Sequence, residues 1–206
     1  MSASDLHTLA DEQAMRIALD QAHNAWLAGE VPVGAVIMRQ GQVIATGYNR
    51  PITTHDPTAH AEIVALRHAS QLLSNYRLPE CELYVTLEPC AMCAMALMHA
   101  RFKRVVFAAT DPKTGVAGSV IDLFANRQLN HHTEIIGGVL AEASSQMLKQ
   151  FFAERRAQIK AHREERRAAT ARQALHGMDV IEGMSDDLPD AIPVGQVIEV
   201  PDGYGN

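Results

Sequence analysis

One histidine, two cysteines and one glutamate have the types and spacing of a hydrolytic metal site. Cys90 and Cys93 are separated by two residues where an apolar run turns into a helical pattern, and His60 opens the triplet His-Ala-Glu upstream. Imidazole and thiolate are good zinc ligands, and a catalytic zinc keeps one coordination position for water. Glu62 is spaced to accept the proton of that water and to hand it on. The pattern predicts His60, Cys90 and Cys93 as zinc ligands and Glu62 as the proton shuttle.

A fourth protein ligand would make the zinc structural instead of hydrolytic. Cys81 opens the strand whose far end carries the site; at ~3.3 Å per residue it lies roughly 30 Å from Cys90, so we expect a buried small hydrophobe. His55 precedes a turn and is a weaker candidate, while His68 and His99 fit ordinary surface or core histidines. The C-x-x-C pair alone also suits two core thiols or a redox pair. Because no good fourth ligand is found, an open site is favoured.

The elements that position these residues follow from hydrophobic periodicity and turn residues. Strands that alternate with helices predict a three-layer α/β/α domain with a five-stranded mixed sheet, in which an antiparallel hairpin lies beside three parallel strands. The expected helices are 5–28, 60–73, 90–100, a short one at 121–124 and a long one over 141–167; the expected strands are 33–38, 43–48, 82–87, 104–109 and 133–139.

Composition indicates a soluble protein of a reducing compartment. The chain has 206 residues, of which 47% are hydrophobic, and contains 3 cysteines, an odd number that argues against a disulfide framework. No apolar run approaches the roughly 18 residues that span a bilayer, and the first residues do not form a secretory signal. We therefore expect a cytoplasmic location and no membrane partner.

The net charge of -6 is unevenly distributed along the chain. No lysine or arginine follows Arg172, whereas seven acidic residues do: Asp179, Glu182, Asp186, Asp187, Asp190, Glu199 and Asp202. Upstream, 149–172 is rich in basic residues and predicts a basic element that an overall acidic balance conceals. We expect a zinc-dependent domain over 1–165 and a flexible, acidic C-terminal extension over 166–206.

The pair H-A-E and P-C-x-x-C is the signature of zinc-dependent nucleobase deaminases. Over roughly residues 12–160 the chain resembles, more specifically, the bacterial tRNA-specific adenosine deaminases of the cytidine/deoxycytidylate deaminase superfamily. The segments that carry this resemblance are Glu30-Val-Pro-Val-Gly-Ala-Val, Gly47-Tyr-Asn-Arg-Pro-Ile, His55-Asp-Pro-Thr-Ala-His-Ala-Glu-Ile, Tyr76-Arg-Leu, Leu83-Tyr-Val-Thr-Leu-Glu-Pro-Cys-Ala-Met-Cys, Arg104-Val-Val-Phe, Lys113-Thr-Gly and Phe151-Phe-x-x-Arg-Arg. The resemblance implies a cytidine-deaminase-like fold, one Zn²⁺ per subunit and a homodimer.

The same resemblance implies a reaction and further site residues. The expected reaction is hydrolytic deamination of adenosine to inosine at the wobble position (position 34) of the tRNA anticodon, with the anticodon stem-loop as the bound partner. Asn49 falls at a base-contacting asparagine of the family; a turn cap at the strand end is the alternative. Asp111 falls near the substrate ribose; a turn aspartate before Pro112, which departs from the family pattern, is the alternative. Glu88 is expected to orient its neighbours.

Basic residues of the last helix complete the predicted RNA-binding surface. Arg155, Arg156 and Lys160 match the basic C-terminal helix of the family and are positioned to contact phosphates, although a solvated face with pairs such as Glu154–Arg155 would look the same. Two other functions share the metal site: deamination of a free base or nucleotide of the guanine or cytosine type, and a non-catalytic deaminase-like subunit. The Lys113-Thr-Gly loop and Phe151-Phe152 beside the basic helix favour RNA, and the intact Glu62 disfavours a mere scaffold.

Overall fold

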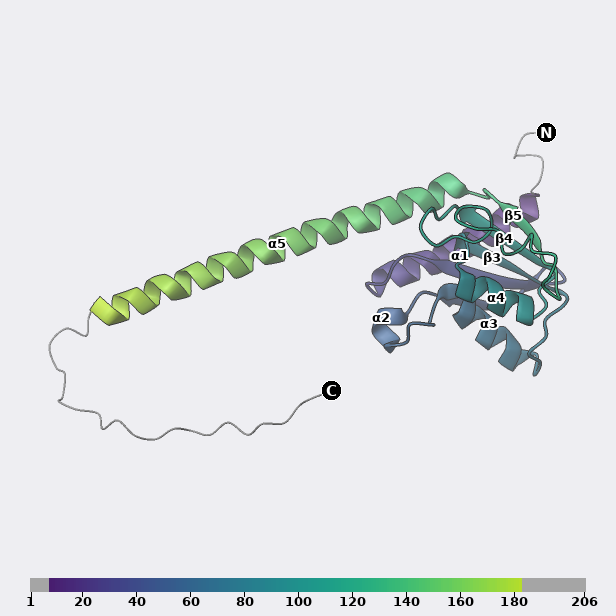
Figure 1. Ribbon diagram of the computed structural model, residues 1–206, viewed down its shortest axis with the longest axis horizontal. Coiled ribbons are helices and arrows are strands. Elements are labelled where there is room, and N and C mark those ends of the chain that lie inside the picture. Colours follow the sequence, from purple (N-terminus) through teal and green to yellow (C-terminus); the bar gives the residue numbers. More distant parts are fainter. Residues whose placement is uncertain (1–7, 183–206) are drawn as a thin grey trace. The chain divides into compact units, whose positions relative to one another are not determined.

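The computed structural model describes residues 8–182, and its five strands form one sheet in the order β2-β1-β3-β4-β5 (Figure 1). The elements along the chain are α1 (Leu9–Leu27), β1 (Gly34–Arg39), β2 (Gln42–Tyr48), α2 (Pro51–Thr54), α3 (Ala61–Leu72), β3 (Cys81–Leu87), α4 (Ala91–His99), β4 (Arg104–Ala109), β5 (Glu134–Gly137) and α5 (Ala141–Glu182).

Strand direction places the ends of β3 and β4 at one edge of the sheet. The hairpin strands β1 and β2 pair antiparallel, and β1 also pairs antiparallel with β3. The strands β3, β4 and β5 are parallel, and Leu87 at the end of β3 is opposite Ala109 at the end of β4. Helix α4 makes the crossover from β3 to β4, so it starts at this edge of the sheet. The mixed sheet with its parallel half was predicted from the sequence and is confirmed.

Side chains that alternate along the strands divide the core into two layers. Ile37, Leu83 and Val85 lie in the cluster that also contains buried residues of α3 and α4. Their neighbours along the strands, Val36 in β1 and Tyr84 in β3, lie in a second cluster with Met15 and other residues of α1. Successive strand residues point to opposite faces of the sheet, so α3 and α4 pack against one face and α1 packs against the other. This is the predicted three-layer arrangement.

Helix α3 lies unusually close to β2 because of one glycine. A Cβ atom at Gly47 would lie 2.5 Å from the carbonyl oxygen of Ala61 and 2.5 Å from the backbone nitrogen of Ala65, distances that real Cβ atoms do not show. Without a side chain at Gly47 the first turns of α3 rest directly on the strand. The start of α3, which carries His60 and Glu62, is thereby fixed against the sheet.

Two expectations about local structure were wrong. The segment 121–124 is not a helix: it folds back in turns, with Gly118 N–H donating to Ile121 O and Leu123 N–H donating to Val116 O. The last helix does not end near residue 167 but continues to Glu182. A short helix, α2, also begins in the loop after β2, with Pro51 at its first position, where the missing N–H has no cost.

The described chain divides after Ala157 into two compact units. The first contains the sheet and the start of α5, where Phe151 packs against Trp26 with ring centroids 5.7 Å apart. The second comprises the rest of α5, whose residues from Gln158 to Thr170 are all exposed. Within 8–182 no helix is both long and apolar enough to cross a membrane. The expected acidic extension falls largely on 183–206, outside the described residues.

Candidate active site

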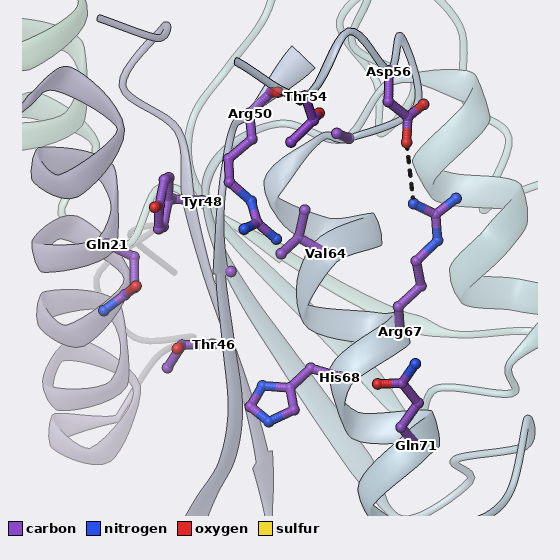
Figure 2. A pocket seen from close by; sticks show the side chains of 12 residues that line it. Gln21, Thr46, Tyr48, Arg50, Thr54, Asp56, Val64, Arg67, His68 and Gln71 are labelled. Atoms are coloured by element: carbon purple, nitrogen blue, oxygen red, sulfur yellow. Dashed lines mark hydrogen bonds and ion pairs between the residues drawn. The ribbon is translucent and has the colours of Figure 1, made fainter. Parts of the chain in front are cut away.

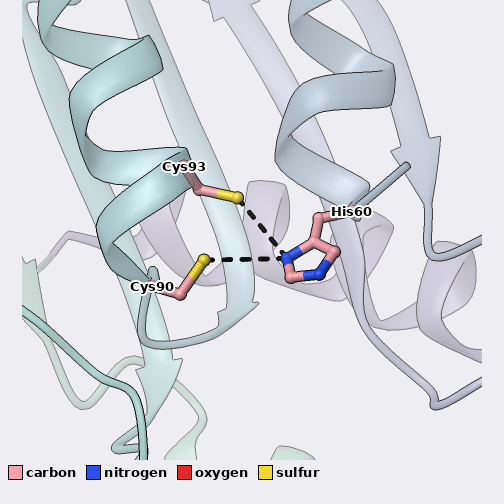
Figure 3. A group of neighbouring side chains, drawn as sticks. All are labelled: His60, Cys90 and Cys93. Atoms are coloured by element: carbon pink, nitrogen blue, oxygen red, sulfur yellow. Dashed lines mark hydrogen bonds between the residues drawn. The ribbon is translucent and has the colours of Figure 1, made fainter. Parts of the chain in front are cut away.

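The three predicted metal ligands lie together at the starts of two helices (Figure 3). His60 is the residue before α3, and Cys90 is the residue before α4, both with extended backbone, while Cys93 lies in the first turn of α4. His60 Nδ1 is 3.7 Å from Cys90 Sγ and 3.6 Å from Cys93 Sγ. Within the described part of the chain these three form the one group of His, Cys, Asp and Glu side chains close enough to hold a metal.

The spacing of the donor atoms fits tetrahedral zinc. With Zn–N of about 2.0–2.1 Å and Zn–S of about 2.3 Å, a tetrahedral angle separates nitrogen from sulfur by about 3.6 Å. The separations from His60 Nδ1 to both sulfurs match this value. Two thiolates and one imidazole also form a donor set that zinc prefers. His60 Nδ1, Cys90 Sγ and Cys93 Sγ are therefore suited to hold zinc, leaving a fourth position.

The local electrostatics favour a thiolate at Cys90. The neighbouring thiol of Cys93 and the ring of His60 lower the pKa of Cys90 to about 4, despite its partial burial. The pKa of Cys93 is instead raised by its hydrogen bond to Cys90 and by its burial. Both sulfurs lie at the N-terminus of α4, where the helix dipole adds to the stabilisation of negative charge.

Glu62 is buried next to the ligand group. Only 4% of the residue is exposed, and it follows His60 in the first turn of α3. Burial and the nearby Cys90 raise its pKa above the ordinary value for a glutamate. Cys90, His60 and Cys93 all act on the pKa of this carboxyl group, which places it beside the metal ligands. A carboxyl group with a raised pKa, held beside an open metal position, is suited to accept and return a proton at neutral pH.

The other candidates for a fourth ligand lie elsewhere. Cys81 is 1% exposed in the core at the start of β3, as expected for a buried small residue. His55, His68 and His99 are not fully buried, and none of them belongs to the metal-binding group found in the described chain. The three-ligand group thus agrees with the open site expected from the sequence.

Asn49 and Asp111 are both engaged in local hydrogen bonds. Asn49 follows β2, is 9% exposed, and its side-chain oxygen accepts a hydrogen bond from Ala61 N–H at 2.9 Å. The Asp111 carboxylate accepts hydrogen bonds from Lys113 N–H at 2.9 Å and from the Thr114 hydroxyl at 2.6 Å. Asp111 therefore has the turn-stabilising role considered as its alternative in the sequence, whereas Asn49 caps the start of α3 and not a turn at the strand end.

The basic residues of α5 are exposed to solvent. Arg155 and Arg156 take part in none of the ion pairs among the described residues, whereas Lys160 lies 4.0 Å from the Glu164 carboxylate. Of the two phenylalanines that precede them, Phe151 is buried, and 43% of Phe152 is exposed. Phe151 therefore attaches α5 to the core, and Phe152 alone is exposed enough to contact a ligand.

A cavity of about 410 Å³ opens beside α3 but does not include the metal ligands (Figure 2). It is bordered by β2, α2 and the outer side of α3. Arg50 stacks over the Tyr48 ring at 5.5 Å, and Arg67 pairs with Asp56 at 3.3 Å. The side chains of Arg50 and His68 both face the cavity (Figure 2). This opening is distinct from the metal group, so the presence of a cavity does not by itself locate the predicted metal site.

Two buried carboxylates near the site were missed or underestimated from the sequence. Glu30 is 1% exposed, and one of its carboxylate oxygens accepts a hydrogen bond from Thr53 N–H at 2.6 Å, which holds the turn of α2. Glu88, expected only to orient its neighbours, accepts hydrogen bonds from the loop after β4. The available signal was a charged residue beside an apolar strand, because buried carboxylates need partners.

Comparisons with known proteins agree on the family. Residues 9–109 match the family described as cytidine and deoxycytidylate deaminase zinc-binding region. The tRNA-specific adenosine deaminase of Haemophilus influenzae is 48% identical over 161 residues, which cover 78% of this chain and 93% of that protein. A solved structure from a study of A-to-I editing by tRNA:A34 deaminases at the wobble position is 41% identical, with a TM-score of 0.64, covering 66% of this chain and 99% of that one.

A second group of solved structures shares the fold at lower identity. The guanine deaminase of Nitrosomonas europaea is 27% identical, with a TM-score of 0.59, covering 69% of this chain and 84% of that one. Enzymes that act on different substrates therefore share this fold and the deaminase chemistry. The tRNA-specific adenosine deaminases are distinguished from the others by their higher identity to this chain and by the nearly complete coverage of their length. The chain belongs to the family of tRNA-specific adenosine deaminases.

Proposed function

We propose that this protein converts adenosine to inosine at the wobble position of a tRNA anticodon, with water as the second substrate and ammonia as the second product. The observation that carries the proposal is the group of His60 Nδ1, Cys90 Sγ and Cys93 Sγ beside the buried carboxyl of Glu62. Membership of the family supplies the substrate class.

The residues divide the reaction between them. Zinc, when bound by His60, Cys90 and Cys93, supplies a water whose pKa is lowered towards about 7. Glu62 takes one proton from the attacking water and gives it to N1 of the adenine ring. It then takes a second proton from the new hydroxyl at C6 and gives it to the amine, which leaves as ammonia. Asn49, with its oxygen engaged by Ala61 N–H, has its side-chain NH₂ group left to meet the base. The adenine ring reaches this site after leaving its stack in the anticodon loop.

The substrate assignment is tested by measuring inosine in an anticodon stem-loop with adenosine at the wobble position, alongside free adenine, guanine and cytosine. We expect turnover of the stem-loop and none of the free bases. A stem-loop with guanosine at that position is the matched control for RNA binding without reaction. If only the free bases are turned over, the protein is a free-base deaminase and the tRNA proposal is wrong. If the protein retains zinc but turns over none of these substrates, a non-catalytic deaminase-like subunit is favoured.

We also propose one Zn²⁺ per chain, a homodimer and a cytoplasmic location, because the donor group is single within the described residues and the family resemblance implies the rest. Metal analysis of the purified protein and light scattering after size exclusion measure the first two. We retain the division into a deaminase domain over 1–165 and an extension over 166–206. Deletion of the extension is expected to leave wobble deamination intact, and a loss of activity would move the boundary.

A further inference from the structure

The carboxylate of Glu88 accepts hydrogen bonds from both ends of one loop. Glu88 lies between β3 and Cys90 and is 3% exposed. Its Oε2 accepts from Asp111 N–H at 2.9 Å and from the Ser119 hydroxyl, and its Oε1 accepts from Ala117 N–H at 2.8 Å and Ser119 N–H at 3.2 Å. We name the segment 111–119, which follows β4, the 111–119 loop. Both ends of this loop are held by a single side chain.

Backbone contacts place the same loop against the metal-ligand turn. Val116 N–H donates to Pro89 O at 3.0 Å, and Gly115 forms an isolated bridge with Cys90. A Cβ atom at Gly115 would overlap with Glu88 Cδ and would lie 2.6 Å from Asp111 O. Position 115 therefore accepts only glycine as long as the Glu88 carboxylate and the backbone of Asp111 stay where they are. The 111–119 loop is packed directly beside a metal ligand, with the Glu88 side chain as its support.

A second buried carboxylate in the chain has a different role. Asp11 is 1% exposed and binds Arg104 at 2.6 Å and the Tyr84 hydroxyl at 2.9 Å, so it joins α1 to the middle of β3 and the start of β4. Those partners are parts of the core. Glu88 has no cation within ion-pair distance among the described residues, and the loop that it binds has an exposed segment at Pro112, Lys113 and Thr114. Its hydrogen bonds order a surface loop.

We propose that Glu88 is a positioning residue, which fixes the 111–119 loop so that Asp111 and Lys113 meet the RNA substrate in a preset arrangement beside Cys90. The inference rests on the proposed function for its substrate. Preset loops reduce the ordering that substrate binding must otherwise bring about. Loss of Glu88 therefore weakens substrate binding more than it slows the chemical step, because Glu62 and the metal ligands are not part of the loop.

The test compares Glu88→Ala with Gly115→Ala and with the control Asp11→Asn. Gly115→Ala leaves the carboxylate in the chain but displaces it from the loop, so it should reproduce the effect of Glu88→Ala by a separate route. For both variants we expect retained zinc, faster amide hydrogen exchange in the 111–119 loop, and a KM for the stem-loop raised about tenfold with kcat changed less than about threefold. Asp11→Asn should lower thermal stability and leave loop exchange and KM unchanged.

Several outcomes would overturn the proposal. Unchanged loop exchange and KM in Glu88→Ala would reduce Glu88 to a fold-stabilising group, and loss of zinc would show that it acts on the ligands instead. If Glu88→Ala does not fold, Ser119→Ala, which removes one hydrogen bond, must still raise both loop exchange and KM. If the wild-type protein deaminates no RNA, the proposed function fails, but the hydrogen-exchange comparison still decides whether Glu88 positions the loop.

Discussion

The side-chain oxygen of Asn49 accepts a hydrogen bond from Ala61 N–H, 2.9 Å away, and so joins the end of β2 to the first residue of α3. One of the four N–H groups that a helix start leaves unpaired is satisfied in this way by a residue distant in sequence. The helix that is capped carries Glu62 and begins after His60. The base contact considered for Asn49 is compatible with this helix cap, because one uses the NH₂ group and the other the oxygen.

Two substitutions at Asn49 separate these roles. Asn49→Ala removes the buried acceptor and should lower the free energy of unfolding by about 1–2 kcal/mol, with loss of deamination. Asn49→Asp keeps an acceptor for Ala61 N–H but has no NH₂ group, so it should retain most of the stability and still lose at least about tenfold in kcat/KM. Thermal unfolding and inosine formation measure both effects. A fully active Asn49→Asp enzyme would show that Asn49 caps α3 and does not contact the base.

Replacement of Glu62 tests the proton shuttle. Glu62→Ala should retain zinc, because the ligands are other residues, and should slow inosine formation by about 10²–10⁴-fold. Metal analysis and single-turnover kinetics on the stem-loop provide the measurements. Glu80→Ala, an exposed glutamate that pairs with Arg39 at 2.7 Å, is the matched control and should be fully active. Substantial deamination by Glu62→Ala would remove this carboxyl group from the mechanism.

The buried carboxylate of Asp11 should make stability depend on pH. Burial alone would raise its pKa, but hydrogen bonds from Arg104, Thr8 and Tyr84 outweigh burial and lower the pKa well below the ordinary value. Because the folded pKa lies below the unfolded value of about 3.9, the stabilisation is fully present at neutral pH. It begins to decline near the unfolded value and is lost as the pH falls through the lower, folded pKa.

Asp11→Asn measures this contribution. We expect the variant to lose about 3 kcal/mol of unfolding free energy at neutral pH, since it leaves Arg104 without its buried partner. The difference from wild type should stay constant down to about pH 5 and narrow below about pH 4. Urea unfolding at a series of pH values gives the comparison. A difference that did not change with pH would mean that the lost stability comes from packing instead of charge.

The basic surface of α5 is tested by its salt dependence. Arg155→Ala with Arg156→Ala should weaken binding of the stem-loop and flatten the dependence of log K on log salt by about 0.7 for each phosphate that is no longer neutralised. The control removes two cations at the opposite end of the sheet, Arg39→Ala with Lys103→Ala. If both double variants flatten the salt dependence of binding equally, the effect comes from net charge. If the Arg155→Ala, Arg156→Ala variant leaves the salt dependence unchanged, these two residues belong to the solvated face of the helix and do not contact RNA.

Local spacing was sufficient to predict the metal group. His60, Cys90, Cys93 and Glu62 stand at helix starts that turn residues and periodicity locate, and the alternation of strand residues located both faces of the core. The segment 121–124 was predicted wrongly because its apolar residues suggested a helix, whereas Asp122 accepts from Ala125 N–H and closes a turn. The end of α5 was predicted too early because its later residues have no hydrophobic stripe, although its many alanines favour a helix.

Hydrogen bonds between distant parts of the chain could not be predicted in this way. Glu88 and Ser119 are 31 residues apart, and Glu30 and Thr53 are 23 apart, so no periodic pattern connects them. A buried charge signals that a partner exists but does not say which one. The hydrogen-bond cap between Asn49 and Ala61 has the same character, since it depends on the closeness of α3 to β2 that Gly47 permits.

The attachment of two loops to buried carboxylates has a consequence for diversification of this fold. The ligands stand on helix starts above the sheet, whereas the turn of α2 and the 111–119 loop are each attached through the backbone to one buried carboxylate, Glu30 or Glu88. Apart from the Ser119 hydroxyl, which also donates to Glu88, these attachments do not depend on the side chains that the loops present. Other loop residues can therefore be replaced while the metal ligands stay unchanged, provided that the anchoring glutamate, Gly115 and Ser119 are kept, which offers a route for redirecting such a deaminase to another nucleobase.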